Sequence, residues 1–382
     1  MIVHNFQRKI SKFFGCHSIR SGFINNNRTF ENLENIYFDL KNFDELYNNA
    51  LETRDEVKMQ NITIEANKKN IEVNEYVKHL YNKLKKINYV KKSYMANYDI
   101  DEENWYEDIR FIDGTKYKNK VDLLVGGSPC QSFSIIGKRA GLEDARGTLF
   151  YEFARLIDEI QPDFFIYENV LGMLTHDKGN TWKHIQEIFE SLNYKINVNI
   201  LNSLDYGIPQ NRKRLFVIGF KNHNVNYKEP KPIKLTTTMK NYLEAKVETK
   251  HYLGKKGFEF VTNPKYKNRA RVNHDIIQTQ KANQQFNWNG DFVFEPLDKI
   301  KNNEKIMNRA YVGNWNGQIG VIRQLSYREC LRLMGFSDSF KIVVPNVPAY
   351  RQIGNSIVVN VLEAILESAF NAMRSVEWKK LD

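Results

Sequence analysis

Residues 121–134 read VDLLVGGSPCQSFS and carry the strongest structural signal in the chain. An apolar run that ends in glycines, here residues 121–125 before Gly126 and Gly127, is typical of a buried strand in a parallel sheet. Ligands of open α/β sheets bind just beyond the carboxyl ends of the strands, which is where Cys130 would lie. Taken alone, Cys130 would be better interpreted as a buried structural cysteine near a turn. The polar residues that follow it favour a thiol placed for chemistry.

The composition favours a soluble intracellular protein that binds a polyanion. The 382 residues include 56 Lys and Arg against 45 Asp and Glu, which gives a formal net charge of +11 at pH 7. Such a balance is typical of nucleic-acid-binding proteins, although lysines that only solvate the surface would give the same count. Three cysteines without paired spacing argue against a disulfide framework and against a metal site. No apolar run reaches the length of a membrane span, so we expect a cytoplasmic protein without membrane association. We also expect a monomer.

Strands and helices alternate through the middle of the chain. This alternation predicts an α/β fold, a doubly wound, Rossmann-like domain with a parallel sheet. After a polar loop at 132–147, residues 149–160 have helical spacing with one apolar stripe. The remaining predicted elements of this region are a helix at 182–192 and strands at 163–167, 194–201 and 214–220.

The regular alternation stops near residue 222. Residues 223–320 contain scattered prolines, many Asn and Lys residues, and aromatic residues without periodicity, which favours a smaller, irregular domain. Residues 1–222 and 321–382 would then form one domain, with a charged helical insertion at about 44–100.

Helical periodicity returns at residues 325–334 and 350–373. In the first of these segments, Ser326 and Glu329 have the spacing of a capping box. This spacing favours a structural role for Glu329 over a catalytic one.

Polar residues follow or begin several of the predicted strands. Glu168 comes at the end of a strand and could supply an acid beside Cys130. Gln210, Arg212 and Arg214 alternate, so a strand would project all three to one face. Two guanidinium groups on that face could bind a phosphate or orient a ring carbonyl.

A last polar group, residues 352–356 with the sequence QIGNS, opens a long apolar segment. Backbone donors and a small polar side chain can meet a ligand there. Each group also has a structural interpretation, with Glu168 or Asn355 as helix caps and the arginines as solvated charges. Their joint occurrence favours chemistry.

These stretches resemble, in order and spacing, the C5-cytosine DNA methyltransferases, and in particular the bacterial enzymes of restriction–modification systems. The resemblance covers about residues 105–222 and 321–370. Its blocks are GSPCQSFS at 127–134, RGTLF at 146–150, ENV at 168–170, YGIPQNRKR at 206–214, RQL at 323–325 with EC at 329–330, and GNS at 354–356.

The resemblance implies a reaction and assigns roles in it. A cytosine would be flipped out of the DNA duplex, because its reactive edge cannot be reached in the stack. Cys130 would add to C6, and Glu168 would hydrogen-bond the base at N3 and its exocyclic amine. Arg212 and Arg214 would hold the base and sugar-phosphate and would favour the thiolate. C5 would then take the methyl group of S-adenosylmethionine, and loss of the C5 proton with expulsion of Cys130 would release 5-methylcytosine.

The resemblance also implies how DNA is held. The loop at 132–147 would close over the DNA, and residues 223–320 would form the target-recognition domain. A cognate restriction endonuclease would be a functional partner only. The implied DNA-binding residues are Gln131, Ser134, Lys138, Arg139, Arg146 and Gln210.

The N-terminal cofactor block departs from the family pattern Phe-x-Gly-x-Gly-Gly. Residues 13–18 read FFGCHS, so His17 and Ser18 stand where the family has glycines. This departure leaves open a relative that binds DNA but is impaired in cofactor binding; a tRNA methyltransferase of the same family and an unrelated Rossmann-type thiol enzyme are further alternatives. The residues that the resemblance assigns to S-adenosylmethionine are Phe13, Gly15, Asp39, Asp108, Ile109, Pro129, Leu149, Asn355 and Ser356.

Overall fold

The chain divides into two compact units. The first unit comprises Met1–Lys91 and Tyr98–Pro162, and the second comprises Lys92–Asn97 and Asp163–Asp382. This division does not separate residues 223–320 from the rest of the second unit, so the predicted domain boundaries stay a prediction. The computed structural model describes residues 61, 87–101, 104–106, 109, 112–128, 149–283 and 288–378. Most of the predicted helical insertion lies outside these residues; within it, helix α4 spans Tyr89–Asn97.

In the first unit, the strand and the helix on either side of the predicted loop are confirmed. Strand β1 runs over Leu123–Gly126 and helix α5 over Leu149–Ile160. Helix α5 is amphipathic and buries Phe150 and Phe153. A Cβ atom added at Gly126 would lie 2.6 Å from the Phe153 ring, so glycine is what allows α5 to pack against the end of β1.

The strands of the main sheet of the second unit pair antiparallel, which corrects the expectation of a parallel sheet. Strands β2 (Phe164–Asn169), β5 (Lys213–Phe220) and β3 (Lys195–Asn202) lie side by side in the order β2-β5-β3. Strand β5 is antiparallel to both neighbours, so β2 and β3 run in the same direction. A helix connects β2 to β3, whereas β3 reaches β5 through residues 203–212, a connection short enough to return the chain antiparallel beside its neighbour.

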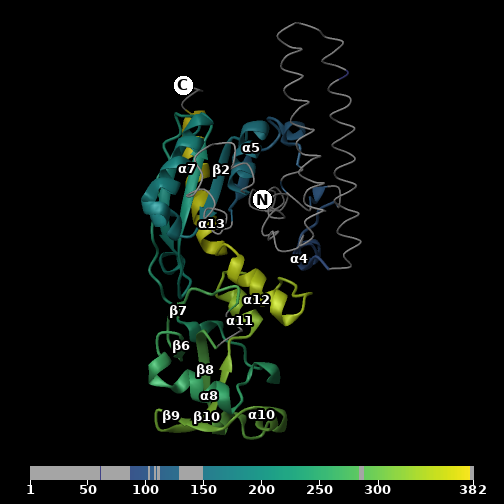
Figure 1. Cartoon of the computed structure of the whole chain (residues 1–382), viewed down its shortest axis with the longest axis vertical. Helices are drawn as coiled ribbons and strands as arrows, with labels where there is room; N and C mark the ends of the chain where they lie inside the picture. Colours follow the sequence, from purple (N-terminus) through teal and green to yellow (C-terminus); the bar gives the residue numbers. More distant parts are fainter. Residues whose placement is uncertain are drawn as a thin grey trace. The chain divides into compact units, whose positions relative to one another are not determined.

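Helices cover both faces of this sheet (Figure 1). On one face, Phe189 of helix α7 (Asn180–Ser191) contacts Phe165, with ring centroids 4.9 Å apart. On the other face, Phe370 of helix α13 (Val359–Trp378) contacts Phe164 edge-on at 5.6 Å. Alternate side chains of β2 therefore meet opposite helices, which explains why this strand is apolar on both faces.

Helix α13 is a core helix. The stretch Asn346–Val376 is long and apolar enough to cross a membrane on the test of length and composition, because an 18-residue window within it has a mean hydropathy of 1.3. Soluble core helices pass the same test, and Ile365 and Ala369 of α13 are fully buried in the protein. The predicted helical segments at 325–334 and 350–373 correspond to α11 (Tyr327–Arg332), α12 (Asn346–Asn355) and α13.

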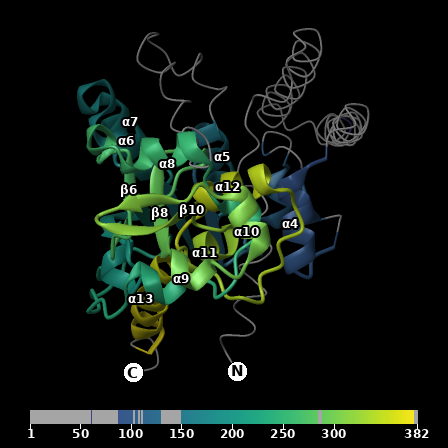
Figure 2. The ribbon, with the colours of Figure 1, turned by 90° about the horizontal axis from the view of Figure 1, so that it is seen from below.

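Part of the segment predicted as irregular forms a second sheet (Figure 2). Strands β6 (Ala270–Val272), β8 (Gly290–Pro296), β10 (Gln318–Gln324) and β9 (Gly313–Trp315) lie in the order β6-β8-β10-β9. Its buried residues Phe292 and Ile322 form a hydrophobic core of their own with Phe258 of helix α8 (Lys255–Thr262). The shorter elements of the second unit are α6 (Gly172–Thr175), η8 (His176–Gly179), η9 (Ser203–Tyr206), β4 (Gln210–Asn211), η10 (Met239–Tyr242), η11 (Thr249–His251), α8 (Lys255–Thr262), η12 (Pro264–Tyr266), β7 (Ile277–Gln278), α9 (Leu297–Ile300) and α10 (Glu304–Arg309).

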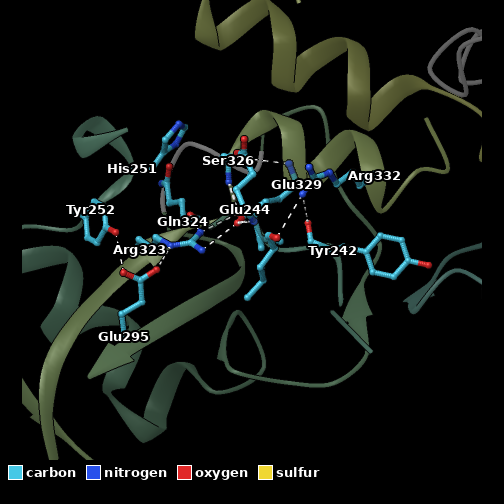
Figure 3. A network of polar contacts seen from close by, with 12 residues as sticks. Tyr242, Glu244, His251, Tyr252, Glu295, Arg323, Gln324, Ser326, Glu329 and Arg332 are labelled. Carbon is cyan, nitrogen blue, oxygen red and sulfur yellow. Dashed lines mark hydrogen bonds and ion pairs between the residues drawn. The ribbon is translucent and has the colours of Figure 1, made fainter. Parts of the chain in front are cut away.

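A buried arginine joins the second sheet to helix α11 (Figure 3). Arg323 on β10 is 1% exposed and makes a bidentate pair with the fully buried Glu329, at 2.8 Å from Nη1 and 2.9 Å from Nη2. Its Nε atom donates to Glu295 on β8 at 2.5 Å. The predicted capping box is confirmed, because Ser326 N donates to Glu329 and Ser326 Oγ accepts from Glu329 N. One glutamate therefore caps a helix and neutralises a buried cation.

We expect Arg323→Met to lower the free energy of unfolding by about 3–5 kcal/mol, because it leaves the carboxylates of Glu329 and Glu295 without their cation. Urea unfolding at pH 7 measures the change. The matched control is Lys183→Met, which removes an exposed pair with Glu187 at 4.0 Å and should cost at most about 0.5 kcal/mol. Equal effects of the two substitutions would contradict a structural role for the buried pair.

Candidate functional site

The register of the main sheet brings Glu168 and Arg214 together. Glu168 of β2 lies opposite Phe216 of β5, and Arg214 is two positions before Phe216, on the same face. Arg214 Nε lies 3.1 Å from Glu168 Oε1. The two side chains are 15% (Glu168) and 17% (Arg214) exposed, so this ion pair is largely desolvated but can still be reached. The predicted strand-end position of Glu168 is confirmed.

Asn169, next to Glu168, fixes the end of β2. Its Nδ2 donates to Tyr167 Oη at 2.9 Å, and its Oδ1 accepts from Val170 N at 2.8 Å. Asn169 is 3% exposed. Sequence reasoning gave this residue no role, although it belongs to the ENV block. Its two hydrogen bonds hold the backbone that carries Glu168.

Gln210 is buried, and its amide is used inside the protein. Its Nε2 atom donates to Leu333 O at 2.8 Å, and its Oε1 atom accepts from Gln280 N at 2.9 Å. The side chain is 0% exposed. These contacts give Gln210 a structural role in this conformation, and a DNA contact by it stays a prediction.

Arg212 is also turned inward. Its Nη1 atom donates to Gln280 O at 2.9 Å, and its Nη2 atom donates to Gly354 O at 3.1 Å and Ser356 O at 2.8 Å. The pKa of Arg212 is lowered to about 9: burial is the largest cause, the charge of Arg214 acts in the same direction, and the charge of Glu168 opposes both. The expectation that Gln210, Arg212 and Arg214 share one face of a strand is wrong, because strand pairing is interrupted at Arg212, between β4 and β5.

The described residues predicted to bind cofactor lie in both units. Ile109 and Leu149 of the first unit are partly exposed apolar residues. In the second unit, Asn355 at the end of α12 is exposed, and the neighbouring Ser356 donates from Oγ to Gln352 O at 2.8 Å. The predicted site residues that lie outside the described residues are Phe13, Gly15, Asp39, Asp108, Pro129, Cys130, Gln131, Ser134, Lys138, Arg139 and Arg146.

A small pocket lies between β7, β8, β10 and α12. Two acceptors in its lining residues, Gln280 Oε1 and Asp291 Oδ1, are buried and have no hydrogen-bond partner. Burial raises the pKa of Asp291 to about 6, while a hydrogen bond from Gln278 N and the charge of Arg271 act against this rise. Sequence reasoning missed Asp291, because its burial depends on strand pairing that no local pattern reveals.

Comparisons with known proteins give one consistent family. Residues 74–371 match the family described as C-5 cytosine-specific DNA methylase. The chain is 35% identical over 266 residues to the Type II methyltransferase M.HhaI of Haemophilus parahaemolyticus, which covers 68% of this chain and 77% of that protein. It is also 35% identical over 290 residues to the Type II methyltransferase M.HpaII of Haemophilus parainfluenzae, covering 72% and 78%. The solved structure of the Entamoeba histolytica methyltransferase EhMeth is 17% identical, with a TM-score of 0.57, and covers 75% of this chain and 88% of that one. This likeness shows a shared α/β methyltransferase fold.

We expect Asp291→Asn to stabilise the protein at pH 8 by about 1–3 kcal/mol. The pKa of Asp291 in the folded state, about 6, lies above its ordinary value of 3.8, so the carboxylate destabilises the fold increasingly from pH 3.8 to 6 and by its full amount above pH 6. This penalty disappears only as the pH falls to the ordinary value, because both the folded and the unfolded state then hold the proton. Thermal unfolding at pH 8 and pH 4 should therefore show the full gain at pH 8 and only a small part of it at pH 4.

The control for this experiment is Asp275→Asn. The Asp275 side chain is 64% exposed, so its substitution should change stability by at most about 0.5 kcal/mol at either pH. A loss of stability in Asp291→Asn at pH 8 would show that the Asp291 carboxylate is favourably bound, contrary to the expectation.

Proposed function

Because the chain belongs to the family of C-5 cytosine-specific DNA methylases, we propose that it transfers a methyl group from S-adenosylmethionine to C5 of a flipped cytosine in a specific duplex sequence. The observation that carries the proposal is the ion pair of Glu168 with Arg214, 3.1 Å apart at the end of β2. The two residues come from separate sequence blocks, ENV and YGIPQNRKR, and the antiparallel register brings them together.

The pair suits the recognition of a cytosine edge. Arg214 Nε engages Oε1 of Glu168 and thereby restricts the orientation of the carboxylate. A carboxyl group held in this way would contact N3 and the exocyclic amine of the base, while the Arg214 guanidinium would contact the ring carbonyl or a phosphate. Exposures of 15% and 17% leave both groups accessible to a base while most water is excluded.

Cys130 is the proposed nucleophile, on the strength of the sequence block that contains it. Its sulfur would bond to C6 of the cytosine, which places electron density at C5. When bound, S-adenosylmethionine supplies the electrophilic methyl group that C5 takes, and the electron pair of the broken sulfur–methyl bond stays on the departing S-adenosylhomocysteine. The C5 proton is then lost, the bond between sulfur and C6 breaks, and Cys130 leaves with its electron pair.

The described residues fit S-adenosylmethionine chemically. Ile109 and Leu149 offer partly exposed apolar surface, which suits an adenine ring. Asn355 presents an exposed amide, which can donate to or accept from a polar group of the cofactor. We propose that these three residues contribute to the cofactor site together with the residues of the N-terminal block.

We propose that the second sheet belongs to the target-recognition domain, at about residues 223–320. A separate hydrophobic core supports the proposal, because it lets this segment vary without disturbing the main sheet. Strand β10 continues past residue 320 to Gln324, so the proposed domain shares a strand with the catalytic part. Named relatives are Type II methyltransferases, and we propose that this chain acts as a monomer and shares a target sequence with a restriction endonuclease.

Duplex DNA that contains 5-fluorocytosine at the target position should trap the protein covalently, because fluorine at C5 cannot leave as a proton does. We expect the adduct with the native chain and not with Cys130→Ser, which should still bind DNA with near-native affinity through phosphate contacts. Denaturing electrophoresis measures the adduct. The matched control is Cys330→Ala, since Cys330 is fully buried and should leave trapping intact. An adduct formed by Cys130→Ser would overturn the assignment.

We expect Glu168→Gln to lower kcat/KM for methyl transfer by about 10²–10⁴-fold, because the amide cannot supply the acid or the charge at the base edge. Steady-state rates at saturating S-adenosylmethionine measure the loss. Glu187→Gln is the control, because Glu187 is 57% exposed on α7 and should leave the rate unchanged. Native turnover in Glu168→Gln would reduce Glu168 to a structural residue.

A further inference from the structure

Residues 277–282, called the strap below, lie against the connection that leads from β3 into β5. Strands β4 and β7 pair in parallel. Ile277 N donates to Pro209 O at 2.9 Å, and Thr279 Oγ1 donates to Asn211 O at 2.8 Å. The strap is therefore attached to the chain that directly precedes the arginine of the Glu168 pair.

Gln210 and Arg212 hold both backbone polar groups of Gln280, at the centre of the strap. Gln210 Oε1 accepts from Gln280 N, and Arg212 Nη1 donates to Gln280 O, each at 2.9 Å. Gln210 also donates to Leu333 O, just after α11, and Arg212 also donates to Gly354 O, near the end of α12. The strap is thus tied to two helices through two buried side chains.

Gly354 shows how closely the strap is packed. A Cβ atom at this position would lie 2.3 Å from Ala282 N and 2.3 Å from Lys281 C. These are backbone atoms, so no side chain can move aside to make room. The strap and α12 meet backbone to backbone, which permits only small displacements.

On its other side, the strap contacts the second sheet. Gln278 N donates to Asp291 Oδ2 on β8 at 2.9 Å. Arg271 on β6 donates from Nη2 to Ile276 O, just before the strap, at 2.9 Å. The strap therefore lies between the chain that carries Gln210 and two strands of the second sheet.

We propose that Gln210 and Arg212 are positioning residues that govern the choice of target sequence through the strap. The inference rests on the proposed role of the second sheet in target recognition. The two side chains fix where the strap lies, and the strap fixes where β6 and β8 lie relative to the Glu168–Arg214 pair. Target selectivity then requires that β6 and β8 keep a fixed position relative to the Glu168–Arg214 pair. The two buried side chains maintain that position.

Burial and bonding favour this role over direct DNA contact. Gln210 is 0% and Arg212 is 4% exposed. Both ends of the Gln210 amide are engaged, and the Arg212 guanidinium donates to three carbonyl groups. Releasing either group to reach DNA would leave buried backbone acceptors or donors without partners.

The test compares kcat/KM for the cognate duplex with kcat/KM for each single-base variant of that duplex. The protein variants are Gln210→Glu and Arg212→Lys. Gln210→Glu keeps a side-chain acceptor but loses the amide donor, and Arg212→Lys keeps the charge but loses the forked guanidinium group. We expect the ratio of cognate to variant rates to fall about fivefold or more in each. Hydrogen exchange at the amides of Ile277 and Gln280 should become faster in both variants.

The control is Tyr227→Phe, which removes a buried hydrogen bond to Asn199 Oδ1 at 2.9 Å that does not involve the strap. It should lower stability and leave selectivity unchanged. Thr279→Val, which deletes one strap contact at its rim, provides a milder variant should the buried substitutions prevent folding, and a smaller loss of selectivity is expected from it.

If Gln210→Glu and Arg212→Lys lower kcat/KM equally for cognate and single-base-variant duplexes, the inference is overturned. It is also overturned if Tyr227→Phe loses as much selectivity as these two protein variants. A native chain that methylates no DNA cytosine would instead overturn the proposed function. If the native chain is selective and Gln210→Glu and Arg212→Lys are as selective as the native chain, the positioning role alone is refuted.

Discussion

The antiparallel entry of β5 between β2 and β3 is the constraint on which the candidate site depends. Because Glu168 lies opposite Phe216, Arg214 must fall beside Glu168, and the ion pair follows from the strand register. The same entry requires the chain to turn within residues 203–212, which places Gln210 and Arg212 where they can reach the strap. A shift of one residue in this register would direct Arg214 to the opposite face of the sheet and separate the pair.

The second sheet is held by two buried polar assemblies, one on helix α11 and the other on helix α12. Arg323 on β10 pairs with Glu329 of α11, and Arg212 joins the strap to α12. Buried ionic groups stabilise a fold weakly but lose much free energy when one partner is removed, so they act mainly against alternative arrangements. We infer that these assemblies specify one orientation of the second sheet relative to the main sheet of the same unit.

The local elements were predictable from the sequence, whereas strand direction and side-chain partners were not. Helix α5 follows from its apolar stripe, and the capping box at Ser326 follows from spacing alone. Periodicity contains no information on direction, so β5 was expected to be parallel. The buried state of Arg212 depends on Gln280 and Gly354, which are 68 and 142 residues away in sequence. Strands as short as β6, with three residues, give no pattern that distinguishes them from a loop.

The central claim is that this chain methylates C5 of cytosine in duplex DNA. The most direct measurement is incubation of the full chain with labelled S-adenosylmethionine and duplex DNA of mixed sequence, followed by digestion and mass spectrometry of the nucleosides. We expect the label in 5-methylcytosine alone, and mapping should locate it in one short recurring sequence. Label in N4-methylcytosine or N6-methyladenine, or transfer to tRNA with none to DNA, would contradict the account.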